Sequence, residues 1–158
     1  MGVFYWDVGK VLQGTSSVTL EVAVSNALSN SYRWFFGSST RNNYLKVQRY
    51  DVNNTLAINV AGESPYYSNS PALTDGLISA AVTYDGAQRR SYRDGARKNT
   101  TSVSQDYATG AAQAEYRIAQ QNAGNGTVYH NIRLYNRALT AEEIAANYAV
   151  DAKRFGIS

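Results

Sequence analysis

Short segments with strand character, separated by turn residues at close spacing, are the feature that most limits how this 158-residue chain can fold. The clearest is residues 18–24, VTLEVAV, in which valine and leucine alternate with Thr19, Glu21 and Ala23. Such alternation is typical of a strand with one buried face, so we expect a half-buried strand here. The segment 77–84 is longer and mostly apolar, which favours a central strand. Five more segments have strand composition: residues 32–37, 44–50, 55–60, 115–120 and 127–135.

The bulk composition fits one globular domain spanning residues 1–158, because the chain is 44% hydrophobic and 17% charged. Many short strands favour an all-β fold, a two-sheet antiparallel sandwich or jelly roll. No apolar run approaches the roughly 20 residues that a membrane span needs, and no signal peptide is visible. The chain has no cysteine, which excludes disulfides and thiolate metal sites. A net charge of +3 is a mild bias, so we expect no nucleic-acid partner.

A β-hairpin is predicted around Asp94-Gly95, a two-residue sequence typical of tight hairpin turns. Residues 88–93 and 96–102 form its two arms, and they carry most of the basic side chains in this region. With a two-residue turn, alternation divides these side chains between two faces. Arg89, Arg93 and Lys98 share one face, and the other carries Arg90, Tyr92 and Arg97.

One helix is predicted near the end of the sequence. Thr140 can cap its first turn, and Glu143 stands three residues later, which makes a capping box. Leu139 and Ile144 have the spacing of a hydrophobic staple. Three further residues should press onto the sandwich with Ile144: Ala141, Ala145 and Tyr148. We interpret this helix as a structural lid that indicates the fold and not the function.

Two stretches resemble a known family. Residues 132–148, IRLYNRALTAEEIAANY, closely resemble the end of the laminin G-like, concanavalin A-like jelly-roll domains, and residues 82–102 resemble the family's strand, Asp-Gly turn and hairpin. The resemblance covers residues 18–148. It implies two antiparallel sheets packed face to face, and a role in binding carbohydrate or protein. The last residues resemble versions from phage structural proteins and gut bacterial surface proteins, and residues 1–17 are either a shortened opening segment or a cut from a longer chain.

The sequence departs from the family in the first arm of the hairpin. Many members have apolar residues where this chain has Arg89, Ser91 and Arg93. An arginine is costly to bury unless it is paired, so we expect this face to be open to water, a ligand or a neighbouring subunit. Calcium sites use carboxylates, and the 12 acidic residues are mostly scattered singly. No cofactor is therefore predicted, and calcium is left open without a matching site.

The candidate ligand-binding residues are basic or aromatic, because sugar rings stack on aromatic faces while nearby polar groups bind hydroxyls. The arginine-rich hairpin is either an anion-contacting surface or an ordinary solvated hairpin. In a regular strand, His130 would lie on the same face as Ile132 and Leu134, which favours a core or rim histidine over a ligand-binding one. Tyr66 and Tyr67 lie in a polar loop between two prolines. The full candidate set is Arg89, Arg90, Tyr92, Arg93, Tyr66, Tyr67, Tyr129 and His130.

Enzyme signatures are missing from the sequence. A glycosidase needs two carboxylates held across its substrate, whereas Glu21 and Glu115 stand alone in their strands. An acid pair that met in space would revive a hydrolase. The leading hypothesis is a non-enzymatic, lectin-like module, extracellular or on a virion, that recognises a glycan on a cell surface or envelope. The alternative is a structural domain, such as a phage fibre, decoration or capping domain, that contacts other copies or virion proteins and has no saccharide site.

Overall fold

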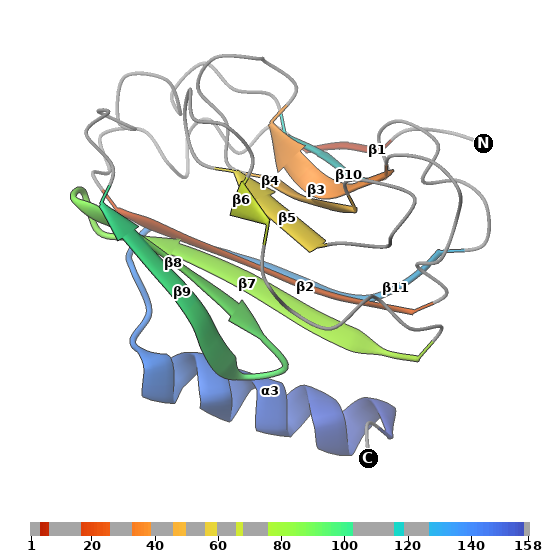
Figure 1. Cartoon of the computed structure of the whole chain (residues 1–158). Coiled ribbons are helices and arrows are strands. Elements are labelled where there is room, and N and C mark those ends of the chain that lie inside the picture. The colour runs from red at the N-terminus through yellow and green to blue at the C-terminus, as the bar shows by residue number, and fades with distance from the viewer. Residues whose placement is uncertain are drawn as a thin grey trace.

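Two antiparallel β-sheets, one of six strands and one of five, lie face to face, and a helix covers the outer face of the five-stranded sheet (Figure 1). The computed structural model describes residues 4–6, 17–25, 33–38, 46–49, 56–59, 66–67, 76–102, 116–118 and 127–156. Side chains are described within residues 17–25, 76–102 and 127–156. The predicted all-β sandwich with a late helix is confirmed.

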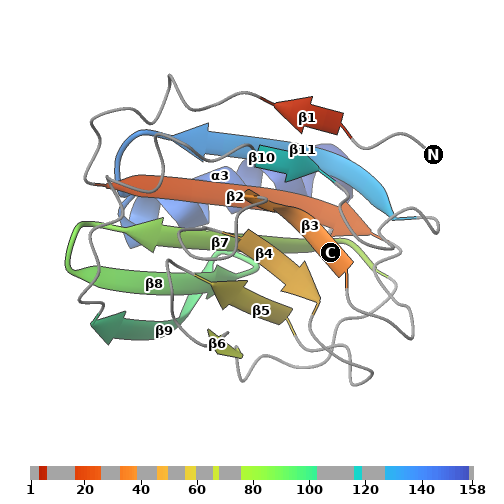
Figure 2. The ribbon, with the colours of Figure 1, turned by 90° about the horizontal axis from the view of Figure 1, so that it is seen from above.

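The six-stranded sheet has the order β1-β10-β3-β4-β5-β6. Its strands are β1 (Phe4–Trp6), β3 (Arg33–Ser38), β4 (Lys46–Arg49), β5 (Leu56–Asn59), β6 (Tyr66–Tyr67) and β10 (Tyr116–Ile118). Figure 2 shows this sheet lying across the other one. The expectation that Tyr66 and Tyr67 lie in a loop is wrong, because they form the edge strand β6, paired with Ala57 and Ile58 of β5. Strands of two or three residues, such as β6 and β1, are too short to show alternation.

The five-stranded sheet has the order β11-β2-β7-β8-β9. Its strands are β2 (Val18–Ser25), β7 (Ile78–Tyr84), β8 (Gln88–Arg93), β9 (Ala96–Ser102) and β11 (Val128–Tyr135). The predicted central position of β7 is confirmed. All four pairings in this sheet are antiparallel.

Strand β2 is buried on both faces, so the prediction of a half-buried strand is wrong. Its apolar residues face the other sheet, and Val18, Leu20 and Val24 are 0% exposed. Thr19 and Glu21, on the opposite face, are also buried. The reason is that helix α3 (Ala141–Phe155) lies over this face.

The predicted hairpin is confirmed in its register, with Arg93 opposite Ala96 and Tyr92 opposite Arg97. Asp94 and Gly95 both have positive φ, of 51° and 73°, as a tight turn between right-handed twisted strands requires. A register shift follows, because Ser91 lies opposite Asn99 and Lys98 is the additional residue of a bulge. Strict alternation therefore fails at Lys98.

Helix α3 begins with the predicted capping box and ends at a glycine. Thr140 Oγ1 accepts from the Glu143 amide, and the Glu143 carboxylate accepts from the Thr140 amide, so the capping box is confirmed. Hydrogen bonds from Arg137 and from the Thr140 amide lower the pKa of Glu143 to about 2. Gly156 ends the helix with a left-handed φ of 70°. No helix in the described part of the chain is long and apolar enough to cross a membrane.

The face that α3 turns toward the sheet is part apolar and part polar. Leu139 and Ile144 are buried with Ala81 and Tyr92 in one cluster, which agrees with the predicted staple. The expectation that Ala145 presses onto the sandwich is wrong, because this residue is exposed. Further along, the buried helix residue is Asp151, which is 1% exposed. The sheet beneath α3 must therefore supply polar partners as well as apolar contacts.

Candidate functional site

Two groups of polar side chains lie between helix α3 and the five-stranded sheet. We call the first the closed cluster: Glu21 of β2, Arg133 of β11, and Asn147 and Asp151 of α3. Arg133 donates to both carboxylate oxygens of Asp151, at 2.7 Å each, and its Nη1 lies 3.5 Å from Glu21 Oε2. Asn147 Nδ2 donates to Glu21 Oε2 at 3.0 Å. Two carboxylates thus share one guanidinium in a buried position.

This arrangement changes the acidity of Glu21. Burial raises the pKa of Glu21 to about 7, and the neighbouring Asp151 carboxylate adds to the rise, while Arg133 and Asn147 oppose it. The two carboxylates are an acid pair that meets in space, as a hydrolase would require. Their side chains, however, are only 5% and 2% exposed, and both are bound to Arg133. They lie beneath helix α3 and, through Arg133 and Asn147, hold the helix on the sheet.

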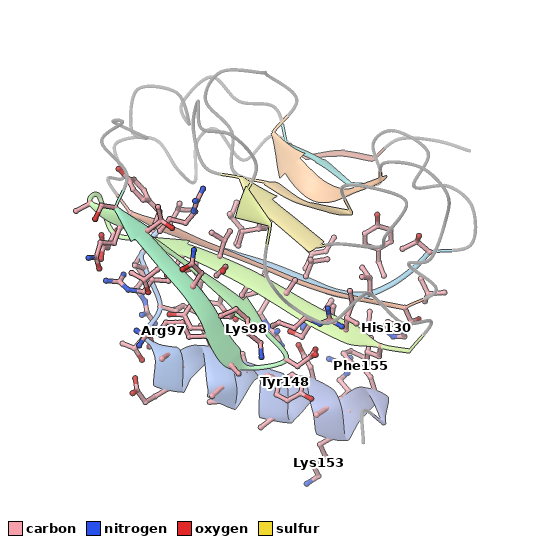
Figure 3. The ribbon with its side chains drawn as sticks, viewed as in Figure 1. Arg97, Lys98, His130, Tyr148, Lys153 and Phe155 are labelled. Carbon is pink, nitrogen blue, oxygen red and sulfur yellow. The ribbon has the colours of Figure 1, made fainter. Side chains whose placement is uncertain are left out.

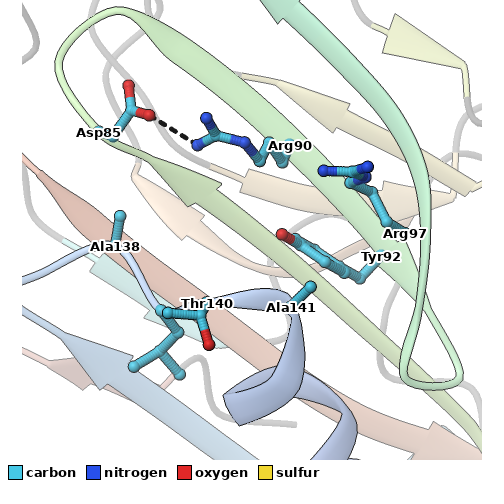
Figure 4. Close-up of a pocket in the computed structure, with 8 residues that line it drawn as sticks. Asp85, Arg90, Tyr92, Arg97, Ala138, Thr140 and Ala141 are labelled. Atoms are coloured by element: carbon cyan, nitrogen blue, oxygen red, sulfur yellow. Dashed lines mark hydrogen bonds and ion pairs between the residues drawn. The ribbon is translucent and has the colours of Figure 1, made fainter.

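The second group lines a pocket of about 270 Å³ between the hairpin and the start of α3 (Figure 4). We call it the open cluster: Asp85, which follows β7, Arg90 and Tyr92 of β8, and Arg97 of β9. The opposite wall of the pocket is the segment Ala138–Ala141. Figure 3 shows Arg97 over the first turns of α3, with His130 and Phe155 near the other end of the helix.

The sheet holds both walls of this pocket in place. Thr19 Oγ1 donates to the carbonyl of Arg137 and accepts from the amide of Leu139, both at 2.8 Å, which fixes the segment before the helix. On the hairpin side, Asp85 Oδ1 accepts from the amides of Ala87 and Gln88. Hydrogen bonds between side chains and the backbone therefore hold both walls of the pocket.

Asp85 and Arg90 form an ion pair at one side of the pocket. Arg90 Nη1 donates to Asp85 Oδ2 at 2.6 Å, and Arg90 Nη2 donates to Gln88 Oε1 at 2.6 Å. Partial burial acts to raise the pKa of Asp85, but the amides of Gln88 and Ala87 together with Arg90 lower it on balance. Asp85 is thus a carboxylate at neutral pH, exposed enough to accept further hydrogen bonds.

Tyr92 and Arg97 differ from this pair because neither side chain makes a hydrogen bond or an ion pair with a described residue. Tyr92 is only 2% exposed, yet its hydroxyl makes no hydrogen bond to a described residue and points into the pocket (Figure 4). Arg97 is exposed and makes no ion pair with a described residue. The Tyr92 hydroxyl is not among the buried side-chain atoms without a partner in the described residues, so it is accessible from the pocket and can bind a ligand or a water there.

Of the predicted ligand residues, the pocket brings together Arg90 and Tyr92. Arg89 and Arg93 lie on the opposite face of β8, turned toward the six-stranded sheet, and are 3% and 6% exposed. The expectation that their face is open is therefore wrong. One reason that burial is tolerated is pairing, since Arg93 Nε donates to Asp94 Oδ2 at 3.0 Å.

The remaining predicted residues lie away from the pocket. Tyr129 and His130 are half-buried in β11, at the opposite edge of the sheet from β9. A register shift at His130 breaks the alternation, so the side chain of His130 does not lie on the same face of β11 as that of Ile132. Its ring centroid lies 5.1 Å from that of Phe155, and its Nε2 is 2.8 Å from Ser25 Oγ. It is thus a rim histidine. The side chains of Tyr66 and Tyr67 lie outside the described residues.

Sequence reasoning missed Asp85 and the helix-side wall of the pocket. The sequence contains a local signal for Asp85, because Asp85-Gly86 is a turn dipeptide that directly follows the strand segment 77–84. The sequence does not show that Asp85 and the segment Ala138–Ala141 lie close together, because their proximity depends on how α3 crosses the sheet. Within the described ranges, no group of three or more His, Asp or Glu side chains could hold a metal ion.

Solved structures of other proteins share this fold at low sequence identity. A chain of botulinum neurotoxin type C, whose cell entry depends on interaction with two ganglioside molecules, matches with a TM-score of 0.70 and 10% identity over 94% of this chain and 39% of its own length. A heptameric SAP-like pentraxin from Limulus polyphemus matches with a TM-score of 0.59 and 14% identity, over 85% of this chain and 70% of its own length. A sialidase of Trypanosoma rangeli matches with a TM-score of 0.61 and 18% identity, over 87% of this chain and 23% of its own length.

These similarities establish a lectin-like fold. The chain spans less than half of the toxin chain, so the activity of that whole protein is not carried over. No curated protein matches this chain in sequence. A family model for the concanavalin A-like lectin/glucanases superfamily, Laminin_G_3, matches residues 5–145, which is most of the chain. The sheet order, the lid helix and this match agree with the resemblance found in the sequence, and the chain therefore belongs to the concanavalin A-like lectin/glucanase superfamily.

Proposed function

We propose that the domain is a non-enzymatic, lectin-like module that binds one sugar unit of a cell-surface or envelope glycan in the pocket between the hairpin and helix α3. The observation that carries this proposal is the Tyr92 hydroxyl, which points into a preformed pocket and has no partner among the described residues. A saccharide hydroxyl is a suitable partner, because it both donates and accepts hydrogen bonds.

The other groups of the pocket also suit a sugar. Asp85 accepts hydrogen bonds, Arg90 and Arg97 donate them, and Leu139 and Ala141 offer an apolar wall for ring C–H groups. A volume of about 270 Å³ is at the small end of ligand pockets, which favours a single ring over a long oligosaccharide. The toxin chain with the same fold acts through gangliosides, which are glycolipids, and this supports a carbohydrate ligand.

A binding role is favoured over catalysis because, among the described residues that line the pocket, Asp85 is the one carboxylate and it is already paired with Arg90. The acid pair of Glu21 and Asp151 is covered by α3. Glycans are displayed on the outside of cells and envelopes, so the proposed place of action is extracellular or on a virion. The expected partner is such a glycan, and contacts with further copies or virion proteins belong to the alternative hypothesis of an assembly domain.

A broad glycan and lipopolysaccharide array, read with and without calcium, tests the proposal. Tyr92→Phe removes the hydroxyl and should weaken binding about 5- to 30-fold, the range of one lost hydrogen bond to a ligand. Tyr148→Phe is the matched control, since Tyr148 packs on Gly95 outside the pocket. Equal binding by both variants would move the site elsewhere. A folded protein that binds nothing on the array would favour the assembly hypothesis.

A further inference from the structure

We infer that the sugar bound in this pocket is acidic, a uronic acid or a similar carboxylated saccharide whose carboxylate pairs with Arg97. The inference rests on the proposed function and names its ligand class. It depends on a difference between the two arginines of the pocket, Arg90 and Arg97.

The charge of Arg90 is already matched inside the protein. Its guanidinium donates to Asp85 Oδ2 and to Gln88 Oε1, each at 2.6 Å. Partial burial of both side chains, at 24% and 33% exposure for Arg90 and Asp85, strengthens the pair relative to one in open solvent. A ligand anion placed against Arg90 would have to compete with Asp85, so this side of the pocket favours sugar hydroxyls.

The charge of Arg97 is not matched in this way. It lies directly opposite Tyr92 across the hairpin, is exposed, and makes no ion pair with a described residue. Glu142 interacts with Arg97 electrostatically without forming an ion pair with it. The pKa of Glu142 is lowered first by its own backbone amide and then by the Thr140 hydroxyl, with a smaller contribution from Arg97.

The other wall of the pocket is the segment Ala138–Ala141, which has no charged side chain, so the charge on the pocket lining near Tyr92 comes from Arg97. A carboxylate between Arg97 and this wall would gain charge-assisted hydrogen bonds, while the neighbouring Tyr92 hydroxyl binds the same sugar ring. The pocket therefore has an anionic end at Arg97 and a hydroxyl-binding end at Asp85 and Arg90.

Matched sugar pairs test the inference directly. Methyl glucuronide is compared with methyl glucoside, and methyl galacturonide with methyl galactoside, by calorimetry and by NMR titration of the whole chain. The acidic member of at least one pair should bind 10- to 100-fold more tightly, the range of a charge-assisted hydrogen bond. Raising the salt from about 20 to 200 mM should weaken acidic binding more than neutral binding.

Two charge-removing variants show whether the position of the charge matters. Arg97→Gln should lower the binding of the acidic sugar to the level of its neutral partner, which abolishes the preference, and leave thermal stability unchanged because Arg97 is exposed. Lys98→Gln removes the same charge from the neighbouring exposed bulge, outside the pocket, and should keep the preference. Equal losses in both variants would mean unspecific attraction and would overturn the inference.

The outcomes also separate this inference from the function on which it rests. Equal binding of acidic and neutral sugars, with Tyr92→Phe still impaired, would overturn the acidic ligand and leave the lectin-like function standing. Binding of no saccharide, acidic or neutral, by the folded protein would overturn both.

Discussion

The closed and the open cluster are built from the same kinds of residue, and both lie between helix α3 and the five-stranded sheet. In the closed cluster, Arg133 holds two carboxylates and amide groups fill the remaining positions. In the open cluster, Arg90 is paired, whereas Arg97 and the Tyr92 hydroxyl are not paired with any described residue. Satisfied and covered polar groups hold the helix on the sheet, and unsatisfied groups at the pocket are free to bind. Removing a residue from the closed cluster should therefore cost stability, and removing one from the open cluster should cost binding.

The largest effect is expected for Asp151→Ala. This change leaves the partly buried Arg133 without its main partner, and breaking a buried ion pair typically costs about 3–5 kcal/mol. Chemical denaturation at neutral pH measures the loss. Asp85→Ala is the matched change in the open cluster and should cost less than about 1 kcal/mol, because that pair is partly exposed. Similar losses for both variants would remove the distinction between the clusters.

The closed cluster should also make stability depend on pH. The folded-state pKa of Glu21, about 7, lies above its ordinary value of 4.5, so the folded protein holds this proton more tightly than the unfolded chain does. The stabilisation is fully present below about pH 4.5 and is lost as the pH rises through 7, with a total of about 3 kcal/mol. Thermal unfolding across pH 4.5–8 should show a decline, and Glu21→Gln should flatten it. A wild-type curve as flat as that of Glu21→Gln would contradict the buried position of Glu21.

An intermediate effect is expected at the hairpin turn, where the helix touches the sheet between the two clusters. Gly95 has a φ of 73°, and an added Cβ would lie 2.8 Å from Cδ1 of Tyr148. Gly95→Ala should therefore cost about 1–3 kcal/mol through backbone strain and overpacking. Gly95→Ala in a Tyr148→Ala background separates the two causes, because only the strain should remain. Full additivity of the two changes would show that the contact is not tight.

The smallest effect on stability is expected for Tyr92→Phe. The hydroxyl has no described partner, so its removal should change the free energy of unfolding by less than about 0.5 kcal/mol, although the residue is 2% exposed. Chemical denaturation of Tyr92→Phe and Asp151→Ala under the same conditions compares the free energy of unfolding that each cluster contributes. A loss above about 1 kcal/mol would mean that the hydroxyl is satisfied within the protein, and the pocket would lose its strongest argument.

Much of the fold could be predicted from local patterns. Alternation located strand β2, apolar and strand composition located β7 and β11, Asp94-Gly95 gave the hairpin register, and Thr140 with Glu143 gave the start of the helix. These features depend on residues close together in the chain, where backbone geometry leaves few choices.

The sites were harder to predict because they depend on distant segments. Alternation separated Arg89 from Arg90 correctly, but it does not say which face of β8 meets the other sheet and which meets the helix. The pairing of Glu21 with Asn147 joins residues 126 positions apart. At His130, one additional residue in the strand reversed the expected face. Each of these depends on tertiary packing, which no local pattern encodes.

The double burial of strand β2 has a consequence for how the chain folds. On the ribosome, residues 18–25 emerge early, but one neighbouring strand, β11, and the helix that covers Glu21 are made more than 100 residues later. Strand β2 therefore stays partly exposed until β11 and α3 have been synthesised. Contacts between segments so far apart in the sequence slow folding and make aggregation of the exposed strand easier. A ribosome-bound chain that stops before residue 128 should accordingly recruit chaperones, and release of the remaining residues should end that need.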